Sequence, residues 1–547
     1  MSLTLNRQRN YLSIAEILII VLLAAVPLFV TFPYRVNIFL TWEGAYRISE
    51  GQLPFRDFGT PLGGMFWVVP GIFMKIFGPQ MISLVKAQVF LNIISGLAFR
   101  SILKSNGVQP GIRFVSVLLY CLSFSFFNFW PWYNHSVIVY EFLALAFLFK
   151  AISRPGAKWA KAWLVLAAFF TVCSLFTKQD AGALGFMLGM VLTGYHSFRE
   201  KKWMPAILYG GSFVLILCLF ILPFRSHEFG YWFNHGQAPH SARISAFEIV
   251  DEFFTGSQWI KFYIFLIIII LFIRFKSWKE LWEDKQTMIF LLLTVGILGE
   301  AAIFQVTSYT PPDNNIFFHS FAIAFVLYIL SGLLPVNFNK TAIVAAYTAG
   351  LLIWWSSVYW KYIQRIAQRA LPATEETVSK TGENVITKKT FMILPKDTLD
   401  VPVSEWKFSG LKSFNKIYMP QPTIDGMNRL LNMDLVKQHK EKGDLKVLNM
   451  SELTPLAVEM PYQLERGSHY PLWYHLGVGM FNKQAEMFEK KIVNKEYDLV
   501  LFEHIPTLNN FYPFRVRDSL LNHYQKVDSF YAPRRGDVKG VIEVYVR

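Results

Sequence analysis

Cysteine is scarce in this chain. The 547 residues include only three cysteines, and Cys121, Cys173 and Cys218 all lie within apolar runs. They lack the close, regular spacing that marks a disulfide framework or a cysteine metal cluster. We therefore expect neither a disulfide nor a metal cluster. A single bound divalent cation stays possible.

Several other signatures are missing. We find no glycine-rich phosphate loop, no dinucleotide-binding fingerprint and no internal repeat. The net charge is +15, but residues 1–360 hold 26 Lys and Arg against 16 Asp and Glu, and residues 361–547 hold 27 against 22. No concentrated basic stripe lies in the polar C-terminal part, which argues against a nucleic-acid partner. Basic loops retained in the cytoplasm explain the excess of positive charge.

Long apolar runs are abundant instead. The chain is 53% apolar and contains 51 Phe, and runs near the bilayer-spanning length of about 20 residues recur up to residue 360. These runs predict a polytopic α-helical membrane protein with about eleven transmembrane helices and an interfacial helix. The predicted spans are 12–32, 80–103, 112–131, 134–152, 161–177, 181–198, 203–224, 259–275, 286–306, 316–334 and 340–360.

The segment 62–78 decides the topology. It is too short to span comfortably, and it contains Pro70 and Lys75. If it lies in the outer interface instead of crossing, the basic clusters of all later loops fall on the cytoplasmic side. We therefore expect an interfacial helix here, a cytoplasmic N-terminus and an exoplasmic C-terminal part.

The C-terminal part has the composition of a soluble domain. We divide the chain into a membrane domain (1–360), a linker (361–395) and an α/β domain (396–547). Strands are predicted at 445–449, 497–502 and 541–546, and helices at 481–493 and 514–523.

Two acidic residues follow the first span in the same outer loop. A partly desolvated carboxylate such as Glu43 can act as a general base, or it can be an ordinary loop residue neutralised by Arg47 or Arg56. Arg56 can bind a phosphate, and Asp57 can orient it or hold a divalent cation. The purely structural alternative for Arg56 and Asp57 is a local ion pair that shapes the loop.

Other polar candidates gather at the same predicted face. Lys178 can pair with a lipid phosphate, or it can extend to the headgroups beside Asp180. Gln179, Asp180, Tyr309 and His235 are candidates for substrate contact, the last two in aromatic and polar outer loops. The histidine spacing around His235 matches no compact metal motif, so we expect no metal site there.

Two further carboxylates lie inside predicted spans. Glu141 and Glu300 sit toward the outer ends of their helices. Ionisable residues within a membrane are costly to bury and often functional, although either could be a structural hydrogen-bonding group.

The stretch from Trp42 to Gly78 resembles a known family. Its elements are Trp42-Glu-Gly, then Gly51-Gln-Leu-Pro-Phe-Arg-Asp-Phe58, then Thr60-Pro-Leu-Gly and Lys75-Ile-Phe-Gly78. Together with Lys178-Gln179, they resemble the large membrane glycosyltransferases of the GT-C superfamily, which include protein O-mannosyltransferases and the aminoarabinose transferase of lipid A. Phe55 stands where tyrosine is commoner, and a single Glu43 stands where most relatives have aspartate.

This resemblance implies an enzyme of the bacterial inner membrane. It would transfer a sugar from a polyprenyl-phosphate donor to a glycan, lipid or protein acceptor, with inversion, at the exoplasmic face. The catalytic base maps onto Glu43, with Asp57 as the alternative, and Arg56 and Lys178 would stabilise the donor phosphate. The rival hypotheses are a transporter or flippase of lipid-linked glycans and a non-catalytic assembly protein.

Overall fold

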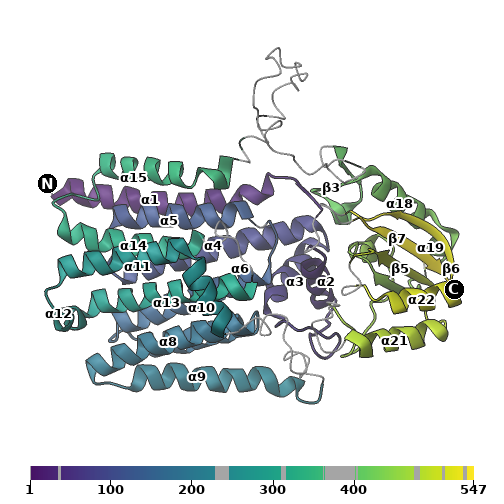
Figure 1. Ribbon diagram of the computed structural model, residues 1–547, viewed down its shortest axis with the longest axis horizontal. Coiled ribbons are helices and arrows are strands. Elements are labelled where there is room, and N and C mark those ends of the chain that lie inside the picture. Colours follow the sequence, from purple (N-terminus) through teal and green to yellow (C-terminus); the bar gives the residue numbers. More distant parts are fainter. Residues whose placement is uncertain are drawn as a thin grey trace, which may run out of the picture.

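The computed structural model describes most of the chain. The described residues are 2–34, 38–127, 129–227, 246–308, 316–360, 405–440, 442–472, 481–507, 512–533 and 539–547, together with residues 363, 367 and 401. Figure 1 shows two parts, a long bundle of helices and a smaller α/β region at one end of it.

Helices occupy all eleven predicted span positions. They run roughly along the long axis of the bundle in Figure 1. They are α1 (Ser2–Ala25), α4 (Met81–Ser105), α5 (Pro110–Phe127), α6 (Tyr133–Ser153), α7 (Ala160–Leu175), α8 (Gln179–Glu200), α9 (Met204–Ile221), α11 (Gln258–Arg274), α13 (Lys285–Ser308), α14 (Ile316–Leu333) and α15 (Thr341–Trp354).

Length and composition identify a multi-pass membrane protein. Among the described residues, five helices are long and apolar enough to cross a bilayer. They become six if α10 (Ala246–Thr255) and α11, which meet at a bend of 75°, form one span. Several of the remaining helices, such as α7 and α14, are shorter apolar helices. Large apolar side chains on α9 and α11, including Leu215 and Phe272, are exposed, as expected for surfaces that face lipid.

The segment between α1 and α4 forms two short helices. These are α2 (Ile38–Ser49) and α3 (Met65–Phe77), which pack on each other at the end of the bundle nearest the α/β region (Figure 1). The 13 residues of α3 extend about 20 Å at 1.5 Å per residue, less than the roughly 30 Å hydrocarbon core. The helix expected within 62–78 is therefore present and short, and its place in the outer interface stays a prediction.

The expectation of a loop around Glu43 was wrong, because this residue lies within α2. The close packing of α2 on α3 explains why a helix forms. The Trp67 indole N–H donates to the Leu40 carbonyl at 2.9 Å, and a Cβ on Gly44 would lie 2.3 Å from the Trp67 ring. Only a residue without a side chain lets the indole approach α2 this closely.

The α/β region contains a four-stranded sheet. Its order is β4 (Val447–Met450), β5 (Leu499–His504), β7 (Val541–Val546) and β6 (Gln525–Tyr531), with β4 and β5 parallel and the other pairs antiparallel. Its main helices are α18 (Gln421–Asn432), α19 (Asp434–Lys440), α21 (Phe481–Val493) and α22 (Phe514–His523). The three predicted strands and two predicted helices are present, whereas β6, α18 and α19 were not predicted.

A second sheet joins the two parts of the chain. It has three strands in the order β1 (Phe32–Pro33), β3 (Ile417–Met419) and β2 (Lys407–Phe408). Phe32 and Pro33 follow the first span directly and pair in parallel with Ile417 and Tyr418. The end of the first span is therefore tied to the α/β region by backbone hydrogen bonds. Nearly all of the predicted linker, 361–395, lies outside the described residues.

The remaining described elements are short. They are the helices α12 (Trp278–Glu283) and α20 (Leu456–Glu459), and the 3-10 turns η1 (Val26–Leu28), η2 (Leu222–Phe224) and η7 (Lys412–Phe414).

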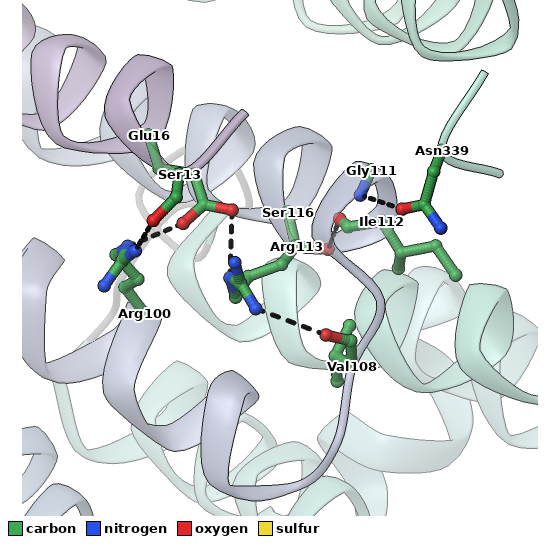
Figure 2. A network of polar contacts seen from close by, with 9 residues as sticks. All are labelled: Ser13, Glu16, Arg100, Val108, Gly111, Ile112, Arg113, Ser116 and Asn339. Carbon is green, nitrogen blue, oxygen red and sulfur yellow. Dashed lines mark hydrogen bonds and ion pairs between the residues drawn. The ribbon is translucent and has the colours of Figure 1, made fainter. Parts of the chain in front are cut away.

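A buried carboxylate joins α1 to α4 and α5 within the bundle. Figure 2 shows Glu16 on α1 between Arg100 of α4 and Arg113 of α5. The carboxylate of Glu16 has no solvent exposure, and its two oxygens lie 2.6 Å from Arg100 Nε and 2.9 Å from Arg113 Nε. Two cations that serve one carboxylate compensate for its desolvation and hold three helices together.

Candidate functional site

Glu43 lies on α2 where this helix faces the α/β region. Its side chain is 12% exposed, and its Oε1 accepts from Arg47 Nε at 2.9 Å and lies 2.8 Å from Arg47 NH2. The pair is spaced i,i+4, which places both residues on one face of the helix. Of the two partners considered from sequence, Arg47 is therefore the one that the structure places against Glu43.

Arg47 is held from several sides. Its guanidinium is only 1% exposed and donates to the Gln52 side chain and to the Glu465 carbonyl, each at 2.8 Å. The guanidinium carbon also lies 4.5 Å from the centre of the Tyr470 ring, within the range of a cation–π contact. An arginine with this many partners has little freedom, so its position relative to Glu43 is well defined.

The environment raises the pKa of Glu43. Burial is the largest effect, because it disfavours the charged carboxylate, while the charge and hydrogen bond of Arg47 lower the pKa in part. The net result is a pKa above the ordinary glutamate value. A carboxylate of this kind is a stronger base than an exposed one and can still ionise because of its arginine partner.

The α/β region forms the wall over this pair. The segment 465–472 docks on the loop 50–64, with Gly467 N–H donating to the Asp57 carbonyl at 2.8 Å and Gly59 N–H donating to the Tyr470 carbonyl at 2.7 Å. Leu472 N–H donates back to Gly59 at 3.0 Å. These backbone contacts set Tyr470 against Arg47.

Arg56 and Asp57 form a local ion pair in the same loop. Arg56 donates to Asp57 Oδ2 from Nε at 3.0 Å and from NH2 at 2.6 Å. The same oxygen accepts from Leu53 N–H at 2.8 Å. Burial tends to raise the pKa of Asp57, but the hydrogen bonds from Arg56 and Leu53 outweigh it and lower the pKa. Asp57 is therefore the weaker base of the two predicted candidates. Arg56 is 41% exposed and can reach a ligand.

Lys178, Gln179 and Asp180 lie together at the turn between α7 and α8. The Lys178 ammonium is fully buried, lies 3.0 Å from Asp180 Oδ2 and sits 4.4 Å from the Phe304 ring centre. Gln179 donates to the Pro61 carbonyl at 2.9 Å. The loop 50–64 thus packs on this turn, and the Lys178 ammonium pairs with Asp180 inside the protein instead of extending to solvent.

One glycine permits this packing. A Cβ on Gly63 would lie 1.6 Å from the Phe176 carbonyl oxygen, which itself accepts from Met65 N–H at 3.1 Å. No side chain can be placed there without separating the loop from the turn.

Glu141 on α6 and Glu300 on α13 are brought together inside the bundle. They are 2% and 4% exposed and lie close enough for the charge of one carboxyl group to act on the other. Among the described residues, their oxygens have no hydrogen-bond donor. Two such groups cannot both carry a full charge at low cost.

Two predicted substrate contacts, His235 and Tyr309, lie outside the described residues. In the part of the chain that the structure describes, no group of three or more His, Cys, Asp or Glu is arranged to hold a metal ion.

Two cavities adjoin α2 on the side of the α/β region. A small one of about 10 Å³ is lined by Glu43, Arg47 and Tyr470, among others, and a volume of this size is near the minimum for one water molecule. A larger one of about 750 Å³ lies beside it, and the two share Tyr462 and Glu465 in their walls. We call the larger one the junction cavity.

Tyr462, Glu465 and Tyr470 of these walls were not anticipated from sequence. They lie in a segment with neither a motif nor a recognisable periodicity, more than 400 positions from α2 along the chain. The i,i+4 spacing of Glu43 and Arg47 is the one local signal that could have located the site within a helix.

Comparison with known proteins finds a likeness to a solved structure. No family model matches the chain, and no curated protein matches it. The structure is similar to the crystal structure of ArnT from Cupriavidus metallidurans bound to undecaprenyl phosphate, over 97% of both chains, with a TM-score of 0.44 and 12% sequence identity.

Proposed function

We propose that the chain transfers a sugar from a polyprenyl-phosphate donor to an acceptor hydroxyl at the exoplasmic face of a bacterial inner membrane. The observation that carries this proposal is the state of Glu43: a desolvated carboxylate with a raised pKa, held by a buried arginine and beside a cavity. Such a group is suited to remove a proton from an alcohol.

Glu43 would act as the base of an inverting displacement. The acceptor oxygen attacks the anomeric carbon of the donor, the bond from that carbon to the phosphate oxygen breaks, and the hydroxyl proton moves to Glu43. Arg47 makes its contacts with Oε1, which leaves Oε2 to take the proton. The products are the glycosylated acceptor and the polyprenyl phosphate.

The leaving phosphate needs positive charge, because it gains negative charge in the transition state. We assign this role to Lys178 and Arg56. Lys178 is buried and held by Asp180, so its ammonium is fixed in a weakly hydrated setting. Arg56 is exposed and offers a planar, bidentate donor to a phosphate.

The test is transfer in nanodiscs from a panel of radiolabelled polyprenyl-phosphate sugars to an envelope extract. We compare wild type with Glu43→Gln and Asp57→Asn at equal folded concentration. Label transferred by wild type and lost only in Glu43→Gln supports the assignment. Loss only in Asp57→Asn moves the base to Asp57 and leaves the reaction class intact. No transfer from any donor by folded wild type argues against the enzyme.

A second candidate function has one observation in its favour. A buried pair of carboxyl groups inside a membrane bundle, such as Glu141 and Glu300, is a common feature of proton- and cation-coupled transport. Reconstituted vesicles with an imposed pH gradient distinguish the two functions. Gradient-driven movement of a lipid-linked glycan that is abolished by Glu300→Gln would favour the transporter.

A further inference from the structure

The junction cavity lies where α2 meets the α/β region. Its volume of about 750 Å³ falls within the roughly 300–1,000 Å³ of small-molecule sites. Tyr46 lines it from α2, one helical turn beyond Glu43, while Lys446 and Val447 line it from the start of β4. Tyr462 and Glu465 separate it from the small cavity beside Glu43. A ligand in the junction cavity is therefore next to the proposed base.

The lining is polar and nearly balanced in charge. Lys446, Arg466 and Lys491 supply three cations. Three carboxylates face them, and they belong to Glu50, Glu465 and Glu496. Among the residues that line the cavity, the aliphatic side chains are Val447 and Leu464. Polar and apolar atoms contribute about equally to this wall, but only these two aliphatic side chains are available to an acyl chain. The balanced charges give no excess of positive charge for a polyanion.

Part of this wall is fixed in place. Glu465 accepts from the Tyr497 hydroxyl at 2.8 Å and forms an ion pair with Lys491. Three tyrosines, Tyr46, Tyr462 and Tyr497, add aromatic faces that carry hydroxyl groups. A sugar has many hydroxyl groups and apolar ring faces. The tyrosine rings can stack on such faces, and the charged and hydroxyl side chains can donate to and accept from the hydroxyl groups.

We propose that the junction cavity binds the acceptor, and that the acceptor is a water-soluble glycan and not a lipid or a protein. This inference rests on the proposed function, because it takes Glu43 as the base. One hydroxyl of the glycan extends past Tyr462 to Glu43, loses its proton there and forms the new bond to the anomeric carbon of the donor. The remainder of the glycan stays among the charged and aromatic side chains.

Binding can be measured separately from transfer. The full-length protein in nanodiscs is exposed in turn to three fractions of the cell envelope: lipid-free and protease-treated carbohydrate, extracted lipid, and protein. Amide hydrogen exchange is then followed over residues 446–447 and 462–466. We expect the carbohydrate fraction alone to slow exchange in these two segments.

Matched variants test whether the cavity is responsible. Lys446→Ala changes the lining, whereas Lys490→Ala changes an exposed lysine outside it. We expect the protection to be lost in Lys446→Ala and kept in Lys490→Ala, with melting temperatures that match wild type. Protection by the lipid or protein fraction, no protection at all, or equal protection in both variants overturns the inference.

A catalytic variant separates this inference from the proposed function. Glu43→Gln leaves the cavity lining intact, so carbohydrate should still protect the two segments while transfer is lost. Protection by carbohydrate in a wild-type protein that transfers no sugar would contradict the enzyme and leave a glycan-binding site.

Discussion

Replacing Arg47 should move the pH dependence of catalysis upward. Arg47 lies within 2.9 Å of Glu43 and lowers its pKa against the effect of burial. An opposite charge at this distance lowers a carboxyl pKa by about 1–3 units, and each unit corresponds to about 1.4 kcal/mol. Arg47→Gln removes the charge but retains a hydrogen-bonding side chain.

The sign of the shift follows from the role of Glu43. A base must be ionised to accept a proton, so kcat/KM falls as the pH drops through its pKa. Without Arg47 the pKa is higher, and we expect the acid limb of the profile of kcat/KM against pH to move up by about one to three units. The assay is sugar transfer in nanodiscs across the pH range, with enzyme quantified by its folded fraction.

Two controls make this prediction refutable. Arg47→Lys keeps the charge, so its acid limb should move less than that of Arg47→Gln. Arg429→Gln removes an exposed arginine that pairs with Asp528 in the α/β region, and its limb should coincide with wild type. An unmoved or lowered limb in Arg47→Gln would refute the assignment of Glu43 as the base.

Three further predictions concern the packing of the bundle. Glu16→Gln leaves Arg100 and Arg113 without their buried carboxylate. We expect a loss of about 3–5 kcal/mol in the free energy of unfolding, measured as a lower melting temperature. An unchanged melting temperature would contradict this. Gly63→Ala should prevent stable folding, since its Cβ would overlap the Phe176 carbonyl. The control Gly156→Ala has open space around it and should elute in size-exclusion chromatography as wild type does. Equal elution of the two variants would refute the close approach at Gly63. Glu300→Gln should raise the melting temperature, because it removes one of two buried ionisable groups that cannot both carry charge at low cost, and a fall would contradict this.

Much of the membrane part could be predicted from local pattern. A transmembrane span needs about 20 apolar residues whatever its neighbours are. Each long apolar run therefore predicted the position of one helix. The strand at 499–504 was equally clear, because a short apolar run bounded by polar residues indicates a buried strand. The helix α2 was missed, since its twelve residues combine aromatic, acidic and basic side chains and are stabilised by packing on Trp67.

The candidate site could be predicted only in part. Glu43, Arg56, Asp57 and Lys178 were identified as candidates because they gather at one predicted face of the membrane part. The resemblance placed Glu43 ahead of Asp57 as the base, and the structure adds a physical reason for that order. Hydrogen bonds lower the pKa of Asp57, whereas burial raises the pKa of Glu43.

Hydrophobic run length is a local property, so a membrane bundle with a polar C-terminal part could be predicted from the amino acids alone. The position of the α/β region over Glu43 became known only from the fold. The bond from Arg47 to the Glu465 carbonyl joins residues 418 positions apart, and no local pattern encodes a contact at that separation. The cavity beside it exists because two parts of the chain meet there, and each part alone contributes only one wall.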